Sequence, residues 1–346
     1  MDESRALPET DATTIRRTLA EGLIVETSGS TARPKRVILS AEALRASARA
    51  TAGAIGEGNW VLALPLSYIA GIMVAVRAAL SSTDLVDLRA EPFDAASFAR
   101  AVAAPPEGKW FTSLVPAQLA RLVDLAESDA TARGALTRFE RILVGGQAIP
   151  ADLVQRANDL GARVTKTYGS AETAGGVIYD GHPIGDTRVR IEDGRILIAT
   201  ASLADGYEGD DDRTSESFET DSEGVRWWRT TDLGEIVDGV LRVTGRADDV
   251  IVTGGVKVAL GDIDRVLRES GIDAAAGWFP DDEWGQVPGV VTTADLELDE
   301  VREAVERTLG KAARPYRLIR VAEIPALSSG KLDRTAVIEI VTRGHA

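Results

Sequence analysis

The chain has 346 residues, 44% of them hydrophobic, and its 54 acidic and 39 basic side chains give a net charge of −15. A chain of this length can bury a large core and is expected to form two domains. The negative charge argues against nucleic acid or an anionic membrane as a primary partner. Because cysteine is absent and only two histidines are present, disulfides, a catalytic thiol, thiolate metal sites and multi-histidine metal sites are excluded.

Neither the first residues nor the apolar stretches carry a targeting signal. Residues 1–17 contain acids where a secretory signal needs a basic start and an apolar core. The most apolar stretch, residues 63–80, is interrupted by polar residues and is too short to span a bilayer, so we expect a buried element. These features predict a cytoplasmic protein without a membrane anchor.

Short β-branched runs alternate with amphipathic helical patterns in the first half of the chain. Strand patterns at 23–26, 141–144 and 164–167 and helical patterns at 41–54 and 151–160 predict a largely parallel sheet with helices on its faces. Further strand patterns, separated by turn signals such as Asp238-Gly239, lie at 189–191, 195–199, 234–237 and 240–243. They predict a smaller antiparallel subdomain.

An acidic segment and a C-terminal region complete the organisation. Residues 205–224 hold nine acidic side chains against one arginine, which predicts a mobile surface loop. Helical patterns follow at 262–269 and 300–309. The sequence thus predicts an α/β protein with a large N-terminal domain at 1–247, containing parallel sheets and the antiparallel subdomain, and a smaller mobile α+β domain at 248–346.

The first motif that suggests chemistry is Thr27-Ser28-Gly29-Ser30-Thr31-Ala32-Arg33-Pro34-Lys35, which directly follows a predicted strand. Hydroxyl and backbone N–H donors around a glycine, followed by a lysine, suit a polyphosphate. The glycine spacing differs from that of the Walker motif. A polar turn before a helix explains the same residues about as well.

Two further motifs suit a nucleotide. In residues 166–173, Tyr168 can present its ring to an adenine, and the carboxylate of Glu172 can hold magnesium against phosphates. A helix capping box is the alternative explanation for Ser170 and Thr173. In residues 229–234, Asp232 is predicted to lie on a tight turn, where it could bind ribose hydroxyls or simply form an Asx turn.

The last two motifs lie in the C-terminal region. Residues 245–255 place Arg246 beside two aspartates and end in the pair Gly254-Gly255, which a narrow ligand could approach closely. Residues 329–334 form a predicted turn with one lysine, Lys331, which could also be an ordinary surface lysine.

In their order and spacing the five motifs resemble the adenylate-forming superfamily of acyl-CoA synthetases, adenylation domains and luciferases, over residues 23–335. The resemblance implies ATP, Mg²⁺ and coenzyme A as ligands, with Glu172 at the metal, Asp248 as a hinge, and Gly254 and Gly255 beside the coenzyme A thiol. It implies catalytic roles for Lys331, Thr31 and Glu172. The residues that it implies for ATP or AMP are Thr27, Ser28, Gly29, Ser30, Thr31, Lys35, Tyr168, Gly169, Thr173, Asp232 and Arg246.

A closer resemblance, carried by residues 112–119, 144–148 and 168–181, is to the short actinobacterial-type o-succinylbenzoate:CoA ligases of menaquinone biosynthesis. The early position of the phosphate loop is similar to theirs. The sequence departs from the superfamily at Ala32 and Arg36, where glycine is common, and at the position of the usual gate histidine, which falls on Ser67 or Tyr68. Residues implied at the acid are Ser67, Tyr68, Ser113, Gln118, Gly146, Gln147, Gly175 and Gly176.

The expected reaction is ATP-dependent ligation of a carboxylic acid, o-succinylbenzoate in the closest resemblance, to coenzyme A through an acyl-adenylate. The alternatives are a ligase for another aryl or fatty acid, an adenylation domain that loads a carrier protein, and a catalytically silent nucleotide-binding homologue. Net charge is compatible with either a monomer or a homodimer.

Overall fold

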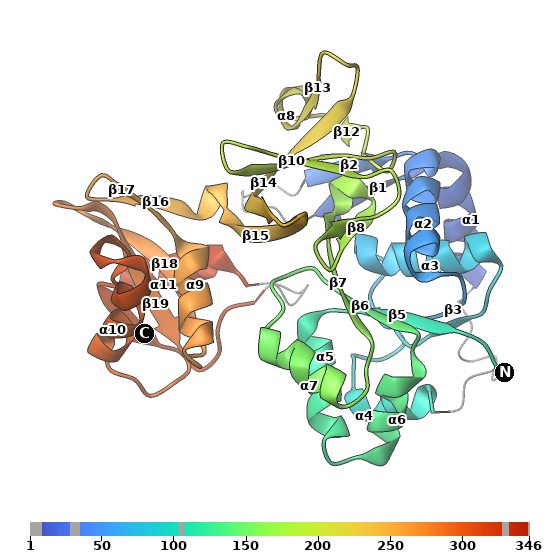
Figure 1. Cartoon of the computed structure of the whole chain (residues 1–346), viewed down its shortest axis with the longest axis horizontal. Helices are drawn as coiled ribbons and strands as arrows, with labels where there is room; N and C mark the ends of the chain where they lie inside the picture. Colours follow the sequence, from blue (N-terminus) through green and yellow to red (C-terminus); the bar gives the residue numbers. More distant parts are fainter. Residues whose placement is uncertain (1–8, 28–34, 104–106, 327–331, 345–346) are drawn as a thin grey trace. The chain divides into compact units, whose positions relative to one another are not determined.

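A computed structural model describes residues 9–27, 35–103, 107–326 and 332–344 (Figure 1). The chain forms two compact units, one made of residues 1–190 and 197–229 and the other of residues 191–196 and 230–346. The domain boundary that the sequence predicts between residues 247 and 248 stays a prediction. Within the described ranges no helix is both long and apolar enough to cross a membrane.

A seven-stranded sheet organises the first unit, with the strand order β4-β3-β5-β6-β7-β8-β9. The strands β4, β3, β5, β6 and β7 run parallel, and β8 and β9 are added antiparallel at one edge. This arrangement confirms the predicted parallel sheet. The bounds are β3 (Asn59–Leu62), β4 (Leu85–Asp87), β5 (Trp110–Leu114), β6 (Arg141–Val144), β7 (Val164–Ser170), β8 (Gly175–Tyr179) and β9 (His182–Pro183).

Helices cover both faces of this sheet (Figure 1). On β3, Trp60 and Leu62 belong to the cluster on the side of α2 and α3, whereas Val61 belongs to the cluster on the opposite side. Strands buried on both faces have continuous apolar runs rather than alternation, which is why their sequences are so hydrophobic. The helices are α2 (Ala41–Ile55) and α3 (Ile69–Ser81) on one face and α4 (Ala95–Ala101), α5 (Pro116–Ala126), α6 (Ala130–Arg138) and α7 (Ala151–Asp159) on the other.

The strand predicted at residues 23–26 does not belong to the parallel sheet. β1 (Leu23–Thr27), which follows α1 (Glu9–Glu21), pairs antiparallel with β2 (Lys35–Leu39), and β12 (Gly206–Tyr207) pairs antiparallel with the other edge of β2. The prediction of a βαβ unit here was wrong because two strands joined by a few residues pair with each other as a hairpin, while a parallel pair needs a long crossover.

The acidic segment at 205–224 is not the predicted loop: it contains β12, α8 (Asp211–Ser217) and β13 (Phe218–Thr220), and β13 pairs with the start of β14 (Arg226–Val237). The side chain of Asp210 accepts a hydrogen bond of 3.1 Å from the Arg213 backbone N–H and so caps α8. Glu219 forms ion pairs with Arg190 (2.6 Å) and Arg229 (2.8 Å), and Arg229 is the main cause of its lowered pKa. Arginines from outside the segment thus neutralise part of its negative charge and favour its ordered structure.

The described part of the second unit contains mainly antiparallel strands, one parallel pair formed by β19 and β20, and three α-helices. The hairpin of β14 and β15 (Val240–Arg246) turns at Asp238 and Gly239, both with positive φ, as the turn signal predicted. Helices predicted at 262–269 and 300–309 are confirmed as α9 and α10. The bounds are β16 (Val250–Thr253), β17 (Val256–Ala259), β18 (Ala274–Asp281), β19 (Gly285–Thr292), β20 (Arg317–Arg320), α9 (Leu260–Glu269), α10 (Leu298–Leu309) and α11 (Arg334–Arg343). The strands β10 (Arg188–Glu192), β11 (Arg195–Ala199) and β14 each have residues in both units.

Candidate functional site

The predicted phosphate loop joins β1 to β2. Thr27 and Lys35 are register partners at the ends of these strands, and the Thr27 hydroxyl donates to the Lys35 carbonyl at 3.5 Å. Ser28, Gly29, Ser30 and Thr31, like Lys331, lie outside the described residues. The structure therefore fixes the two ends of this loop at Thr27 and Lys35.

Glu172 lies in the short helix η2 (Ala171–Thr173), and its side chain is only 4% exposed. Its Oε2 accepts a hydrogen bond from the Ser170 hydroxyl, and its Oε1 accepts one of 2.9 Å from the Tyr207 hydroxyl. Both donors are neutral, and no basic side chain in the described part of the chain forms an ion pair with Glu172. The hydrogen bonds thus fix this buried carboxylate in place without pairing it with a cation of the described residues.

The described residues contain no group of three or more acidic or histidine side chains that could hold a metal ion. A single carboxylate nevertheless suits magnesium bound with a nucleotide, because that ion takes most of its ligands from phosphates and water. Glu172 therefore suits the predicted role of holding magnesium together with a nucleotide. The described residues do not form a site in which protein groups alone surround the ion.

Ser170 and Thr173 form the capping box that was the alternative explanation for this motif. The Thr173 hydroxyl accepts a bond of 2.9 Å from the Ser170 backbone N–H and donates to the carbonyls of Gly175 (2.7 Å) and Ser170 (3.1 Å). These bonds fix the backbone around Glu172. A contact between Thr173 and a nucleotide stays a prediction.

Tyr168 and Gly169 lie where β7 pairs with β8, and the register shifts between them. A Cβ atom on Gly169 would lie 2.1 Å from the carbonyl oxygen of Gly175, so only glycine fits at this crossing of the strands. The irregularity places Tyr168 two residues before the capping box. Its predicted contact with adenine remains to be tested.

Tyr207 is a site residue that sequence reasoning missed, because it lies in the acidic segment. Burial, and then the nearby charge of Glu172, raise the pKa of Tyr207, so its hydroxyl keeps the proton that it donates. The Lys35 ammonium lies 5.6 Å from the centroid of its ring. The signal in the sequence was an aromatic residue directly after Gly206 inside a run of charges.

The residues predicted to bind the acid occupy several loops and strand ends of the first unit. Ser113 is buried in β5, and Gln118 uses its amide to accept from the Val115 N–H (3.2 Å) and to donate to the Ala63 carbonyl (3.2 Å). Ser67 and Tyr68 precede α3, Gly146 and Gln147 follow β6, and Gly175 and Gly176 begin β8. Their contacts with a substrate stay predictions.

Arg77 is a second residue that sequence reasoning missed. It lies on α3, is 6% exposed, and its guanidinium is 5.3 Å from the centroid of the Trp60 ring. Its Nε has no hydrogen-bond partner, and no carboxylate of the described residues forms an ion pair with it. Burial lowers the pKa of Arg77. In the sequence, Arg77 is only an interruption of a hydrophobic stretch, so sequence reasoning did not assign it to a site.

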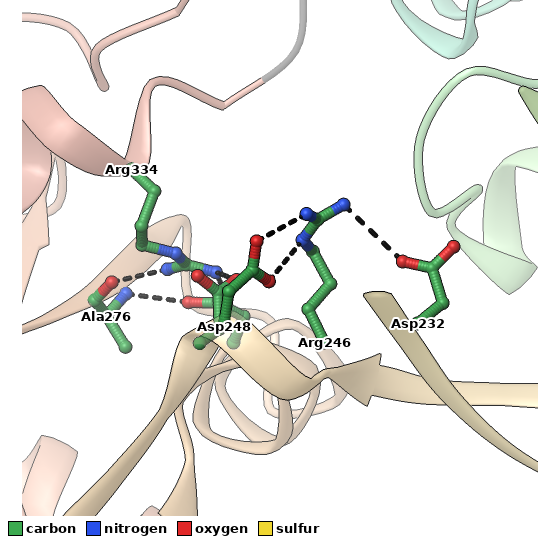
Figure 2. A network of polar contacts seen from close by, with 7 residues as sticks. Asp232, Arg246, Asp248, Ala276 and Arg334 are labelled. Atoms are coloured by element: carbon green, nitrogen blue, oxygen red, sulfur yellow. Dashed lines mark hydrogen bonds and ion pairs between the residues drawn. The ribbon is translucent and has the colours of Figure 1, made fainter. Parts of the chain in front are cut away.

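Asp232 and Arg246 are brought together in the second unit (Figure 2). They are register partners on β14 and β15, and the Arg246 guanidinium lies 3.4 Å from Asp232 and 2.6 Å from Asp248. The predicted turn at Asp232 was wrong: the residue lies within a strand, next to a register shift after Leu233. The backbone irregularity near the Asp232 carboxylate is therefore a β-bulge in a strand pair and not a turn.

Beyond Asp248, the network in Figure 2 reaches the start of α11. Arg334 forms an ion pair of 2.6 Å with Asp264 and one of 3.4 Å with Asp249, and it also donates to the Ala276 carbonyl. Asp264 accepts a bond of 2.6 Å from the Ala276 N–H. The side chains of Arg334 and Asp264 are 16% and 10% exposed, so this is a buried ion pair that ties α11 to α9 and β18.

Gly254 and Gly255, the pair predicted beside coenzyme A, form the turn between β16 and β17. Both have positive φ, 55° and 82°, which favours glycine. A Cβ atom on Gly254 would also lie 2.7 Å from the Trp284 ring, while one on Gly255 would meet no atom within 4 Å. The turn requirement by itself explains both glycines, and the ligand contact stays a prediction.

Comparisons with known proteins agree with this arrangement. Residues 23–208 match the model of a family described as AMP-binding enzyme. The "Probable 2-succinylbenzoate--CoA ligase" of Mycobacterium tuberculosis H37Rv is 37% identical over 329 residues, which cover 91% of this chain and 83% of that protein. The "2-succinylbenzoate--CoA ligase" of Escherichia coli K12 is 28% identical over a region that covers 92% of this chain and 68% of that protein.

Among solved structures, a variant of E. coli MenE with bound OSB-AMS has a TM-score of 0.72 and 26% identity, over 92% of this chain and 68% of that one. This likeness confirms the predicted fold class. The family match extends from β1 to the residue after Tyr207, so it contains the phosphate loop, Glu172 and both of its hydrogen-bond donors. The chain belongs to the AMP-binding enzyme family.

Proposed function

We propose that this chain activates o-succinylbenzoate with ATP to form an acyl-adenylate and then transfers the acyl group to coenzyme A. The 37% identity with a relative named for this ligation, across nearly the whole chain, supports the choice of acid. The observation that carries the nucleotide chemistry is the buried carboxylate of Glu172, which has hydroxyl donors but no cationic partner among the described residues.

In the proposed site, the segment from Thr27 to Lys35 surrounds the phosphates of ATP. Glu172 holds magnesium, which when bound neutralises phosphate charge. Tyr168 contacts the adenine, with Gly169 and Thr173 beside it, and Asp232 and Arg246 bind the ribose. These assignments rest on the positions of the residues in the family motifs.

In the first step, a carboxylate oxygen of the acid attacks the α-phosphorus of ATP in line, and the bond to pyrophosphate breaks. The chain supplies positioning and positive charge for this step. We assign Lys331 to the incoming carboxylate and the α-phosphate, with Thr31 at the phosphates. In the second step, the thiol of coenzyme A, directed past Gly254 and Gly255, loses its proton and attacks the acyl carbon, and AMP leaves. We infer that residues 248–346 move about Asp248 between the steps.

Arg77 supports an acid that carries a second negative charge. Met73 and Arg77 are four residues apart and therefore share a face of α3. A Cβ atom on Gly175 would lie 3.4 Å from Met73, so this face meets the start of β8, where Gly175 and Gly176 are predicted to line the acid pocket. A buried cation without an anionic partner is unfavourable until an anion binds. This favours a dicarboxylic acid over a fatty acid.

The proposal is tested by incubating the protein with ATP, magnesium, coenzyme A and a panel of acids, and by measuring thioester mass and pyrophosphate release. The panel contains o-succinylbenzoate and three acids with a single carboxylate: 4-phenylbutyrate, which lacks the aromatic carboxylate and the ketone, benzoate, which lacks the succinyl chain, and octanoate, which lacks the ring as well. We expect o-succinylbenzoyl-CoA and an E172Q variant that has lost most of the activity. A thioester formed only from another acid would exclude this substrate, and pyrophosphate release from none would exclude the activity.

The cytoplasmic location and the choice between monomer and homodimer belong to the same proposal. Sedimentation of the protein in solution decides the oligomeric state. Neither property enters the chemistry proposed above, because every residue assigned to it belongs to one chain.

A further inference from the structure

The carboxylate of Glu172 is held by hydrogen bonds from two sides. Ser170 donates from the same capping box, two residues away, so its contact is local. Tyr207 donates to the other oxygen at 2.9 Å from a strand 35 residues later in the chain. The Tyr207 contact therefore joins Glu172 to a separate element of the fold, whereas the Ser170 contact stays within one motif.

Tyr207 is itself anchored at several points. β12 pairs with β2, and Tyr207 is the register partner of Val37. The Tyr207 backbone N–H donates to the Thr214 hydroxyl at 2.9 Å, and the Tyr207 ring lies 5.9 Å from that of Phe218. The hydroxyl therefore has little freedom to turn away from Glu172.

The ring of Tyr207 also contacts the base of the phosphate loop. The Lys35 ammonium lies 5.6 Å from the ring centroid, within the range of a cation–π interaction. Lys35 is the first residue of β2, and Tyr207 lies on β12, which pairs with β2. The Tyr207 side chain therefore contacts both Lys35 of the phosphate loop and Glu172 of the next motif.

We propose that Tyr207 is a positioning residue, whose hydroxyl orients the Glu172 carboxylate for the cation bound with ATP. This inference rests on the proposed function, in which Glu172 holds that cation. Groups that hydrogen-bond to a metal-binding carboxylate set its direction, and their loss typically weakens metal affinity about tenfold to a hundredfold.

The test is a titration of the protein with Mn²⁺ in the presence of ATP and without any acid, in which free Mn²⁺ is measured by electron paramagnetic resonance. Tyr207→Phe removes only the hydroxyl and is expected to raise the Mn²⁺ dissociation constant about tenfold. Tyr179→Phe is the matched control, because Tyr179 is equally buried and its hydroxyl bonds Thr51 at 3.0 Å; we expect no change in its Mn²⁺ dissociation constant. Thermal unfolding without ATP checks that both variants fold.

A double-mutant cycle with Glu172→Gln separates a positioning role from a general effect on the fold. Once the carboxylate is gone, Tyr207→Phe should weaken Mn²⁺ binding no further. Unchanged Mn²⁺ binding in Tyr207→Phe, or equal losses with and without the Glu172 carboxylate, would overturn the proposal. If wild-type protein with ATP bound no more Mn²⁺ than ATP alone, the proposed function itself would fail, so the two failures are distinguishable.

Discussion

Arg77 is buried and Arg334 is largely buried, but only Arg334 has anionic partners among the described residues, and this difference predicts opposite effects of the same substitution. In Arg77→Met, the Nε donor without a partner disappears, which relieves about 1–3 kcal/mol. The cation–π contact with Trp60, worth about 1 kcal/mol, is lost. We therefore expect the protein without ligands to become more stable by up to about 2 kcal/mol.

Arg334→Met should act in the other direction. It leaves Asp264, which is 10% exposed, without the guanidinium at 2.6 Å, and removes the bond to the Ala276 carbonyl. Breaking a buried ion pair by removing one partner destabilises by about 3–5 kcal/mol. Urea unfolding measures both changes, and hydrogen exchange of the α3 and α11 amides assigns each change to its helix.

The same Arg77→Met variant should be a poor enzyme. Removal of one partner of a buried charge pair loses at least about 2 kcal/mol of binding, so kcat/KM for o-succinylbenzoate is expected to fall at least about thirtyfold. Turnover of an acid without the second carboxylate should fall much less. A destabilised Arg77→Met protein, or equal losses for both kinds of acid, would refute the reasoning that this cation lacks a partner until substrate binds.

Three further predictions concern other parts of the chain. Lys331→Ala should abolish acyl-adenylate formation, measured by pyrophosphate exchange, and largely spare thioester formation from pre-made adenylate; equal loss of both would contradict its assignment to the first step. Gly169→Ala should destabilise by at least about 2 kcal/mol in urea, because its Cβ would lie 2.1 Å from a backbone oxygen, whereas Gly134→Ala, with no atom near, should be stabilising. Asp264→Asn should lower the thermal midpoint by several degrees, and Asp262→Asn on the same helix, whose ion pair is exposed, should leave it nearly unchanged.

Local patterns predicted the parallel sheet and several of its helices correctly. Strands such as β6 and helices such as α7 are specified by short apolar runs and by helical spacing, and both signals are present within a window of a few residues. The β14–β15 turn at Asp238-Gly239 was predicted for the same reason, since the residues that adopt positive φ are themselves the signal.

The errors occurred where distant residues decide the outcome. Residues 205–224 carry too much charge to suggest order, but Glu219 is neutralised by Arg190 and Arg229, which no local window contains. Asp232 was predicted on a turn because its neighbours favour one, whereas pairing with β15 makes it part of a strand. Tertiary context overrides local propensity in both cases.

The sequence by itself determined the family resemblance, the identity of the motif residues and the parallel sheet, because these depend on residue types at fixed spacing. Only the tertiary structure brought Tyr207 to Glu172 and Arg334 to Asp264, and only it left Arg77 without a carboxylate among the described residues. Whether a buried charge has a partner depends on which strands and helices pack together. That packing is a property of the whole fold, and no short stretch of sequence contains it.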